Sequence, residues 1–327
     1  MTLLFPEFRP RAPWWGPDLQ TLRNAVRERR DSELAAGDRR VLLPLHDGTG
    51  DTLAGRLQLP PTPRHAPLVV LIHGLSGCEA SPYMQLSAHF WLTRGHPVLR
   101  LNLRGAGPSR EHCRYQYHAG RSLDLHDALG TLEDELVAAG LVLIGFSLGG
   151  NMLLKFLAEY GREFPVRAAA SVSAPIDLAA ASRRFLAPRN HLYHRHLLKA
   201  MKAECFGGTT AVSEHERERL TAARSIYEFD DYIVAPRNGY RDAEHYYHEN
   251  HARRFLAKID VPTLLIHALD DPWIPQTAYT DYPWQRNARL VPLLPRGGGH
   301  VGFHDRGEDS PWYNRCIGHF VDHQLGR

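Results

Sequence analysis

A serine flanked by glycines, in the pentapeptide Gly-Phe-Ser-Leu-Gly at residues 145–149, constrains this chain more than any other feature. An apolar run, residues 141–144, precedes it, and a stretch of helical character, residues 151–160, follows it. This pattern predicts a strand, a sharp turn and a helix, with Ser147 held on the turn and its hydroxyl exposed. Glycines suit the turn because the backbone bends tightly and passes close to its neighbours. The N-terminus of the helix brings N–H groups and a positive dipole end to the same point, so Ser147 is the predicted nucleophile.

Two later segments contain the partners that a nucleophilic serine needs. A serine hydroxyl reacts when a base takes its proton and an acid orients that base. Residues 261–267 predict a buried strand, and Asp270 and Asp271 stand at its C-terminal end. His300 follows in a glycine-rich loop, residues 297–302. The order serine, aspartate, histidine is that of α/β-hydrolases, so His300 is the predicted base and one of the two aspartates is the predicted acid.

An earlier segment predicts the groups that would hold an oxyanion. The apolar run at residues 68–72 is typical of a strand, and His73 and Leu75 lie in the loop that follows. In α/β-hydrolases the oxyanion hole combines an N–H from this loop with the N–H of the residue after the nucleophile. These donors are predicted to be Leu75 and Leu148. We interpret His73 as a residue that supports the loop through hydrogen bonds, and Ser76 lacks the turn motif of a nucleophile.

Apolar runs alternate with helical stretches along most of the chain. A hairpin is predicted over residues 41–59, because Asp-Gly and Gly-Asp pairs interrupt its apolar runs. Strands are predicted at residues 68–72, 97–103, 141–145, 167–173, 261–267 and 290–294, and helices at residues 83–94, 123–139, 151–160 and 313–324. This alternation predicts an α/β fold with a mostly parallel sheet and helices on both of its faces.

Residues 177–251 break the alternation, because they are polar and helical in character and carry no strong strand signal. We interpret them as a helical cap inserted above the nucleophile, where it would exclude water and shape a pocket. A solvated helical excursion without a role in specificity is the alternative. The hydrolase core is then predicted at residues 41–176 and 252–327. Residues 1–40, rich in Pro, Trp and Arg, are interpreted as an N-terminal extension packed on the core.

Several short motifs resemble the AB hydrolase superfamily, and within it the AB hydrolase 4 (YheT-like) family, over nearly the whole chain. They include residues 17–22, 73–77, 102–105, 117–120, 145–151, 173–178, 229–231, 246–247, 270–272 and 298–303. The extended Gly-Phe-Ser-Leu-Gly-Gly-Asn sequence is much more specific than the bare pentapeptide. The resemblance implies a serine hydrolase acting on ester bonds, often of lipid-like acyl esters, and some similar proteins transfer acyl groups to alcohols.

The resemblance also favours Asp271 over Asp270 as the acid, since the acid is commonly the fourth residue of the motif that starts here at Ala268. Adjacent side chains leaving a strand point to opposite sides, so only one of the two can readily reach His300. Asp271 precedes Pro272, which restricts its backbone. Asp270 would then bond nearby N–H groups of the loop, and it stays the alternative acid.

Charge and cysteine content narrow the class of protein further. The 39 basic residues nearly balance the 36 acidic ones, and a net charge of +3 argues against a nucleic-acid binder. Four scattered cysteines without a Cys-x-x-Cys pair or an export pattern predict a cytoplasmic protein. No apolar run approaches the ~20 residues that span a bilayer. Peripheral membrane contact through Phe8, Trp14 or Trp15 stays open, the alternative being that they pin the N-terminal segment to the core.

Two clusters of histidines have spacings that can place metal ligands on one helix face: His191, His194 and His196, and His245, His248 and His251. No paired cysteines or carboxylates accompany them. Neighbouring arginines, Arg195, Arg253 and Arg254, would also repel a cation. We therefore predict no metal, and the proposed chemistry needs no cofactor.

Together these features predict a carboxylesterase or lipase-like serine hydrolase acting on a small-molecule, lipid-like ester. Ser147 would attack the ester carbonyl, His300 would take its proton, and Asp271 would orient His300; water would then hydrolyse the acyl-enzyme. Two alternatives remain on the same scaffold. One is an alcohol acyltransferase that uses the same residues, and the other is a non-catalytic ligand-binding protein.

Overall fold

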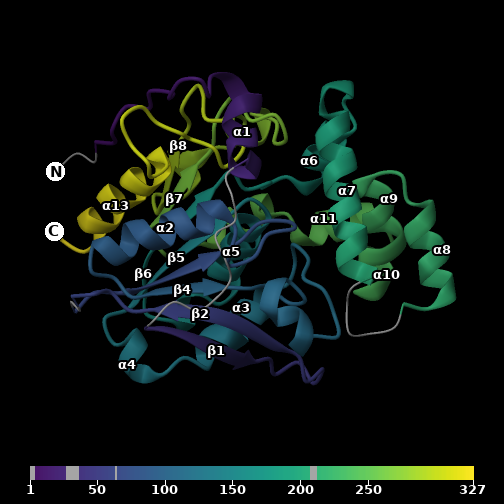
Figure 1. Ribbon diagram of the computed structural model, residues 1–327, viewed down its shortest axis with the longest axis horizontal. Helices are drawn as coiled ribbons and strands as arrows, with labels where there is room; N and C mark the ends of the chain where they lie inside the picture. The colour runs from purple at the N-terminus through teal and green to yellow at the C-terminus, as the bar shows by residue number, and fades with distance from the viewer. Residues whose placement is uncertain (1–3, 27–36, 63–64, 207–211) are drawn as a thin grey trace.

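An eight-stranded sheet forms the centre of the computed structural model, which describes residues 4–26, 37–62, 65–206 and 212–327 (Figure 1). Its strands are β1 (Asp38–Pro44), β2 (Thr52–Gln58), β3 (Leu68–Ile72), β4 (Val98–Leu101), β5 (Leu141–Phe146), β6 (Val166–Val172), β7 (Thr263–Ile266) and β8 (Leu290–Leu293). They lie in the order β1-β2-β4-β3-β5-β6-β7-β8. The hairpin β1–β2 and the pair β2–β4 are antiparallel, and the other neighbours are parallel. The predicted α/β fold is thus confirmed.

Helices cover both faces of this sheet, as predicted. The longer helices outside the β6–β7 connection are α1 (Gly16–Val26), α2 (Pro82–Thr93), α3 (Ser122–Gly130), α5 (Leu148–Glu159) and α13 (Trp312–Gln324). Along β3, Leu68, Val70 and Ile72 belong to the apolar cluster that contains α3 and α5. Val69 and Leu71 belong to the cluster that contains α2 and α13. Alternate side chains of a strand point to opposite faces, so a strand buried on both faces is apolar throughout.

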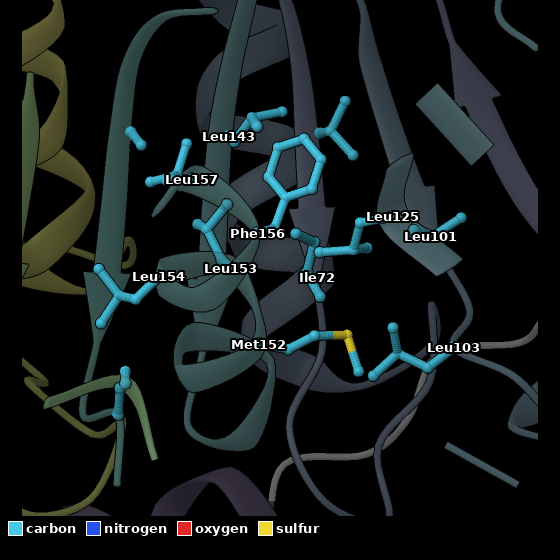
Figure 2. Close-up of a cluster of buried hydrophobic side chains, with 14 of the residues drawn as sticks. Ile72, Leu101, Leu103, Leu125, Leu143, Met152, Leu153, Leu154, Phe156 and Leu157 are labelled. Atoms are coloured by element: carbon cyan, nitrogen blue, oxygen red, sulfur yellow. The ribbon is translucent and has the colours of Figure 1, made fainter. Parts of the chain in front are cut away.

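Helix α5 packs its apolar side chains directly against the centre of the sheet (Figure 2). Met152, Leu153 and Phe156 of this helix belong to one buried cluster with Ile72 of β3 and Leu125 of α3. Such packing fixes the start of α5 relative to the end of β5. It therefore fixes the turn between them, where Ser147 lies.

The structure differs from the sequence prediction at the ends of some elements. The prediction of a single helix over residues 123–139 was wrong, because the chain forms α3 and then a separate short helix, α4 (Asp134–Val137). Gly130 has low helix propensity, and the Thr131 hydroxyl donates to the Ala128 carbonyl and closes the last turn of α3. Helix α5 begins at Leu148, three residues earlier than predicted, because the turn at Ser147 enters the helix directly.

The connection between β6 and β7 is helical. It holds α6 (Leu178–Phe185), α7 (His191–Phe206), α8 (Glu214–Ala222), α9 (Ile226–Phe229), α10 (Ala235–Arg237) and α11 (Ala243–Asn250), which lie together beside the sheet in Figure 1. Residues 177–206 and 212–251, the described part of this connection, contain no strand. Phe185, Leu198 and Leu220 belong to an apolar cluster that this connection forms largely from its own side chains.

The N-terminal segment lies against the C-terminal part of the chain, with α1 beside the loops near β8 in Figure 1. Phe8 packs edge-on against Phe303 and Trp312, with ring centroids 6.0 and 5.6 Å apart, as an anchor would. Trp15 is 59% exposed. Residues 1–3 and 27–36 of the predicted extension lie outside the described residues. Within the described ranges, no helix combines the length and the apolar character needed to cross a membrane.

Candidate active site

Ser147 occupies a strained turn between β5 and α5. Its backbone has φ 50° and ψ −122°, a region that residues other than glycine rarely adopt. The turn tolerates nothing larger than glycine at position 149, since a Cβ there would stand 2.2 Å from the carbonyl oxygen of His73. Such strain persists only where the surrounding structure over-determines it, and it is concentrated at functional sites.

His300 lies within hydrogen-bonding distance of both Ser147 and Asp271. Its Nε2 atom is 2.9 Å from the Ser147 hydroxyl oxygen, and its Nδ1 atom is 2.8 Å from a carboxylate oxygen of Asp271. A carboxylate can only accept, so Nδ1 carries the proton and donates to Asp271. Nε2 is then free to accept the proton of the Ser147 hydroxyl. The structure thus brings together the three side chains that the sequence singled out, from the ends of β5 and β7 and from the loop after β8.

Asp271, rather than Asp270, contacts His300. The second carboxylate oxygen of Asp271 accepts hydrogen bonds from the N–H groups of Trp273 and Ile274, at 2.8 and 3.0 Å. Burial alone would raise the pKa of Asp271, but the charge of His300 and its hydrogen bond, together with the N–H of Trp273, outweigh burial and hold the pKa below its usual value. Asp271 is therefore ionised near neutral pH.

Asp270 has a different environment. Its carboxylate accepts a hydrogen bond of 2.9 Å from the N–H of Gly299, in the loop that carries His300. Burial raises the pKa of Asp270 above its ordinary value. Asp270 thus ties the β7 end to the neighbouring loop, as expected for the aspartate that does not face His300.

Leu75 and Leu148, the predicted oxyanion donors, line the same cavity as Ser147. The loop after β3 is in direct contact with this serine, because a Cβ on Gly74 would stand 2.8 Å from the Ser147 Cβ. Leu148 is the first residue of α5, where helical N–H groups have no intrahelical partner. Within the described residues, neither N–H donates a hydrogen bond to another group.

His73 supports the loop after β3 through hydrogen bonds, as the interpretation made from the sequence expected. Its Nδ1 donates to the Gly74 carbonyl at 2.7 Å, and its Nε2 accepts from the Leu103 N–H at 3.0 Å. Burial lowers the pKa of His73 to about 4, so the ring is neutral and satisfies one acceptor and one donor.

Sequence reasoning missed three residues around His300. Trp273 packs its ring on the imidazole, with centroids 4.2 Å apart. His267 is fully buried, stacks on Tyr279 at 4.1 Å, and places its Nδ1 3.9 Å from Asp271. Thr21 of α1 accepts a hydrogen bond from the His300 N–H at 2.8 Å. Trp273 and His267 stand beside the Asp-Asp-Pro motif, and Thr21 lies in the motif at residues 17–22. These motifs marked the three residues, but they gave no indication that the residues contact His300 or Asp271.

A cavity of about 950 Å³ opens onto Ser147 and His300. Helices of the β6–β7 connection contribute most of its apolar wall: Leu178, Phe185, Leu197, Met201, Ile226, Phe229 and Ile233. Asp230 adds a carboxyl group to the same wall and accepts a hydrogen bond of 2.7 Å from the Tyr247 hydroxyl. Burial raises the pKa of Asp230 to about 7. The wall that these helices contribute is therefore largely apolar, as the walls of small-molecule sites usually are.

The two histidine clusters do not converge on one point. His194 is buried, and its Nε2 accepts a hydrogen bond of 3.0 Å from the Ile226 N–H, which ties α7 to α9. His191 and His196 are exposed on the same helix. In the part of the chain that the structure describes, no group of three or more His, Cys, Asp or Glu side chains is arranged to hold a metal ion.

A mostly parallel sheet with a serine on the sharp turn after β5, and an aspartate and a histidine hydrogen-bonded in sequence, defines the class of α/β hydrolases. The family profile described as the alpha/beta hydrolase fold matches residues 67–306. The chain belongs to the AB hydrolase superfamily and, within it, to the YheT-like family.

Relatives of the chain have names associated with ester chemistry. The "Putative esterase YheT" of Escherichia coli is 35% identical over 80% of this chain and 77% of its own length. "Phospholipase ABHD3" of Mus musculus is 26% identical over 76% of this chain, and the match spans 60% of that relative. "Medium-chain fatty acid ethyl ester synthase/esterase 2" of Saccharomyces cerevisiae is 28% identical over 78% of this chain and 61% of its own length.

Solved structures share the fold. The esterase Pf2001 of Pyrococcus furiosus superimposes with a TM-score of 0.62 over 91% of this chain and 97% of that chain. The two sequences are 16% identical, so this likeness concerns the fold alone.

Proposed function

We propose that this protein is a serine hydrolase that cleaves carboxylic esters through an acyl-enzyme. The observation that carries the proposal is the 2.9 Å approach of His300 Nε2 to the Ser147 hydroxyl on a strained strand-to-helix turn. Asp271 at 2.8 Å from Nδ1 holds the ring in the tautomer that leaves Nε2 free to accept a proton. The esterase and lipase names of the relatives support the same chemistry.

The proposed reaction assigns one step to each group. The Ser147 oxygen attacks the ester carbonyl as His300 takes the hydroxyl proton, and His300 then gives that proton to the departing alcohol. The N–H groups of Leu75 and Leu148 hold the oxyanion, each worth about 3 kcal/mol in the transition state. Asp271 stabilises the charged imidazole. Water, activated by His300, then releases the acid and restores Ser147.

A fluorophosphonate probe and a series of nitrophenyl esters from acetate to palmitate test the proposal. We expect a single adduct on Ser147 and hydrolysis of at least part of the ester series. A folded protein that forms no adduct at Ser147 and cleaves no ester would instead be a ligand-binding protein on a hydrolase scaffold.

An acyltransferase that uses an alcohol in place of water is the second candidate, because the yeast relative's name pairs a synthase with an esterase. The distinction lies in which acceptor reaches the acyl-enzyme. Product analysis with ethanol added to the ester would separate the two, since a transferase forms ethyl ester in excess of free acid.

We propose that the β6–β7 connection, residues 177–251, acts as a cap that sets acyl chain length. Leu197 and Ile226 belong to its apolar cluster and line the cavity that reaches Ser147. Leu197→Phe or Ile226→Phe should shorten the pocket and lower kcat/KM for the longest accepted ester by about tenfold, since one methylene in such a pocket changes specificity by about 10–200-fold. The nitrophenyl ester series measures this shift.

Leu198→Phe is the matched control for the cap variants. Leu198 is buried in the same cluster but is not part of the cavity wall. It should lower thermal stability without moving chain-length preference, and all three variants should keep the wild-type rate of labelling by a small fluorophosphonate. Equal preference across the variants would leave the connection without a role in selectivity.

We also propose that α1 contacts a lipid surface from which ester substrates enter the cavity. Leu19, Leu22 and Val26 of α1 recur at helical spacing and are 43, 40 and 69% exposed, and Trp15, just before the helix, is 59% exposed. Leu22 also lines the cavity, so this apolar stripe is continuous with the route to Ser147. A helix with an apolar face of this kind lies in the plane of a membrane interface.

Flotation with phosphatidylcholine vesicles that contain phosphatidylglycerol measures this contact. The double variant Leu19→Ser/Val26→Ser should reduce vesicle binding several-fold and leave hydrolysis of a soluble short-chain ester unchanged. Leu42→Ser/Leu59→Ser removes side chains that are 52 and 59% exposed elsewhere and should bind as wild type does. Equal loss of binding in both double variants, or no binding by the wild type, would contradict the contact.

We further propose a cytosolic location, which the four free cysteines support.

A further inference from the structure

Helix α1 lies directly against the loop that carries His300. Three polar side chains on one face of α1 bond the backbone of this loop. The Thr21 hydroxyl accepts from the His300 N–H at 2.8 Å, and the Asn24 amide donates to the Val301 carbonyl at 2.9 Å. The Gln20 side-chain amide bonds both backbone groups of His304: it accepts from the N–H at 2.6 Å and donates to the carbonyl at 3.2 Å. These contacts join positions that are 277 to 284 residues apart in the sequence.

The loop depends on such external partners because its backbone is irregular. Val301 and Phe303 have φ values of 54° and 48°, which β-branched and bulky residues rarely adopt. Conformations of this kind persist only where neighbouring groups over-determine them. Outside α1, the Val301 N–H donates to the Ser173 hydroxyl and the Phe303 N–H to the Gly298 carbonyl. The N–H of His300 itself depends on Thr21.

The Thr21 hydroxyl is held in a fixed direction. Its proton is donated to the Pro17 carbonyl one helical turn earlier, at 2.7 Å, so an oxygen lone pair is left for the His300 N–H. Thr21 is 7% exposed and His300 is 4% exposed, so water has little access to replace the bond. A buried N–H without a partner is unfavourable, and the loop would move to satisfy it.

We propose that Thr21 is a positioning residue for His300, with Asn24 in support, so that the polar face of α1 sets the position of the predicted base. This inference rests on the function proposed above. Asp271 fixes the rotation of the imidazole ring through its hydrogen bond to Nδ1, and Trp273 packs against one face of the ring. The bond to Thr21 fixes the backbone from which the ring projects, and hence the distance between Nε2 and the Ser147 oxygen.

The kinetic test compares Thr21→Val, which removes the hydroxyl at nearly constant shape, with Thr21→Ser, which keeps it. Thr21→Val should lower kcat and the rate of fluorophosphonate labelling by about 10–100-fold, because a displacement of about 1 Å at a reacting group has effects of this size. KM should stay within about twofold of wild type, because Thr21 lines the cavity and valine keeps nearly the same shape there. Thr21→Ser should restore most of the rate, and Asn24→Ala should show a smaller loss in the same direction.

Thr131→Val is the matched control, since the Thr131 hydroxyl also bonds a helix carbonyl, that of Ala128, far from the cavity. It should keep the wild-type kcat. A Thr21→Val enzyme with the wild-type kcat, or a Thr21→Ser enzyme as slow as Thr21→Val, would overturn the positioning role. If Thr21→Val does not fold, the kcat of Asn24→Ala decides the outcome in the same way.

A second measurement is independent of catalysis. The proton on His300 Nδ1, bonded to Asp271, should give a downfield proton resonance that shifts or broadens in Thr21→Val and returns in Thr21→Ser. An unchanged resonance in Thr21→Val would overturn the inference even if the protein hydrolysed no ester. Failure of the proposed function is recognised separately, by a wild type that neither forms an adduct nor cleaves any ester.

Discussion

Ser147→Ala should abolish ester hydrolysis, with a fall in kcat of about 10⁴–10⁶-fold, the scale on which a triad nucleophile is lost. The reason is chemical, because alanine has no oxygen to form the acyl-enzyme and His300 Nε2 then faces no proton donor. Residual turnover would come from the oxyanion donors and from substrate binding. Initial rates on the best nitrophenyl ester, together with fluorophosphonate labelling, measure the loss.

The fold should survive this change. Ser147 makes its structural bonds through the backbone, since its N–H donates to the Val172 carbonyl at 2.8 Å and its carbonyl accepts from Gly150 and Asn151. Alanine keeps those bonds, so the free energy of unfolding should change by no more than about 1 kcal/mol. Ser87→Ala, which removes a buried hydroxyl bonded to Asn314, is the control that should keep both labelling and turnover. A Ser147→Ala protein that keeps a tenth of the wild-type kcat would refute the assignment of the nucleophile.

Much of the fold was predictable because its strands are short, apolar and separated by recognisable turns. The run at residues 141–144 and the following Gly-x-Ser-x-Gly define β5 and the turn, and no tertiary contact was needed to locate Ser147. The break between α3 and α4 was missed because a helical pattern continues across Gly130. The low helix propensity of Gly130 and the hydrogen bond from the Thr131 hydroxyl to the Ala128 carbonyl end α3 there.

The surroundings of His300 were less predictable than the residue itself. A sequence motif gives the type and order of the reacting side chains, but it gives no distance between segments. Thr21 and His300 are 279 positions apart, and only the packing of α1 on the C-terminal loops brings them together. The cavity wall was hard to predict for the same reason, since tertiary packing brings Leu197 and Ile226 together from separate helices of the β6–β7 connection.

Asp271→Asn should lower kcat by about 10⁴-fold, as loss of the orienting acid can, while Asp270→Asn one residue away serves as its matched control. In the Asp271→Asn variant the amide can present an N–H toward His300 Nδ1, which favours the tautomer with the proton on Nε2. That tautomer cannot accept the Ser147 proton, although every backbone bond of the loop remains possible.

Asp270→Asn should act mainly on stability, because the Asp270 carboxylate bonds the Gly299 N–H at 2.9 Å and does not face the imidazole. We expect a loss of no more than about 1–2 kcal/mol in the free energy of unfolding. Turnover should stay near that of the wild type, since an amide oxygen can still accept from Gly299 and leaves the bond between Asp271 and His300 in place. Steady-state kinetics and thermal unfolding of the two variants, measured side by side, distinguish the roles. A larger loss of kcat in Asp270→Asn than in Asp271→Asn would reverse the assignment of the acid.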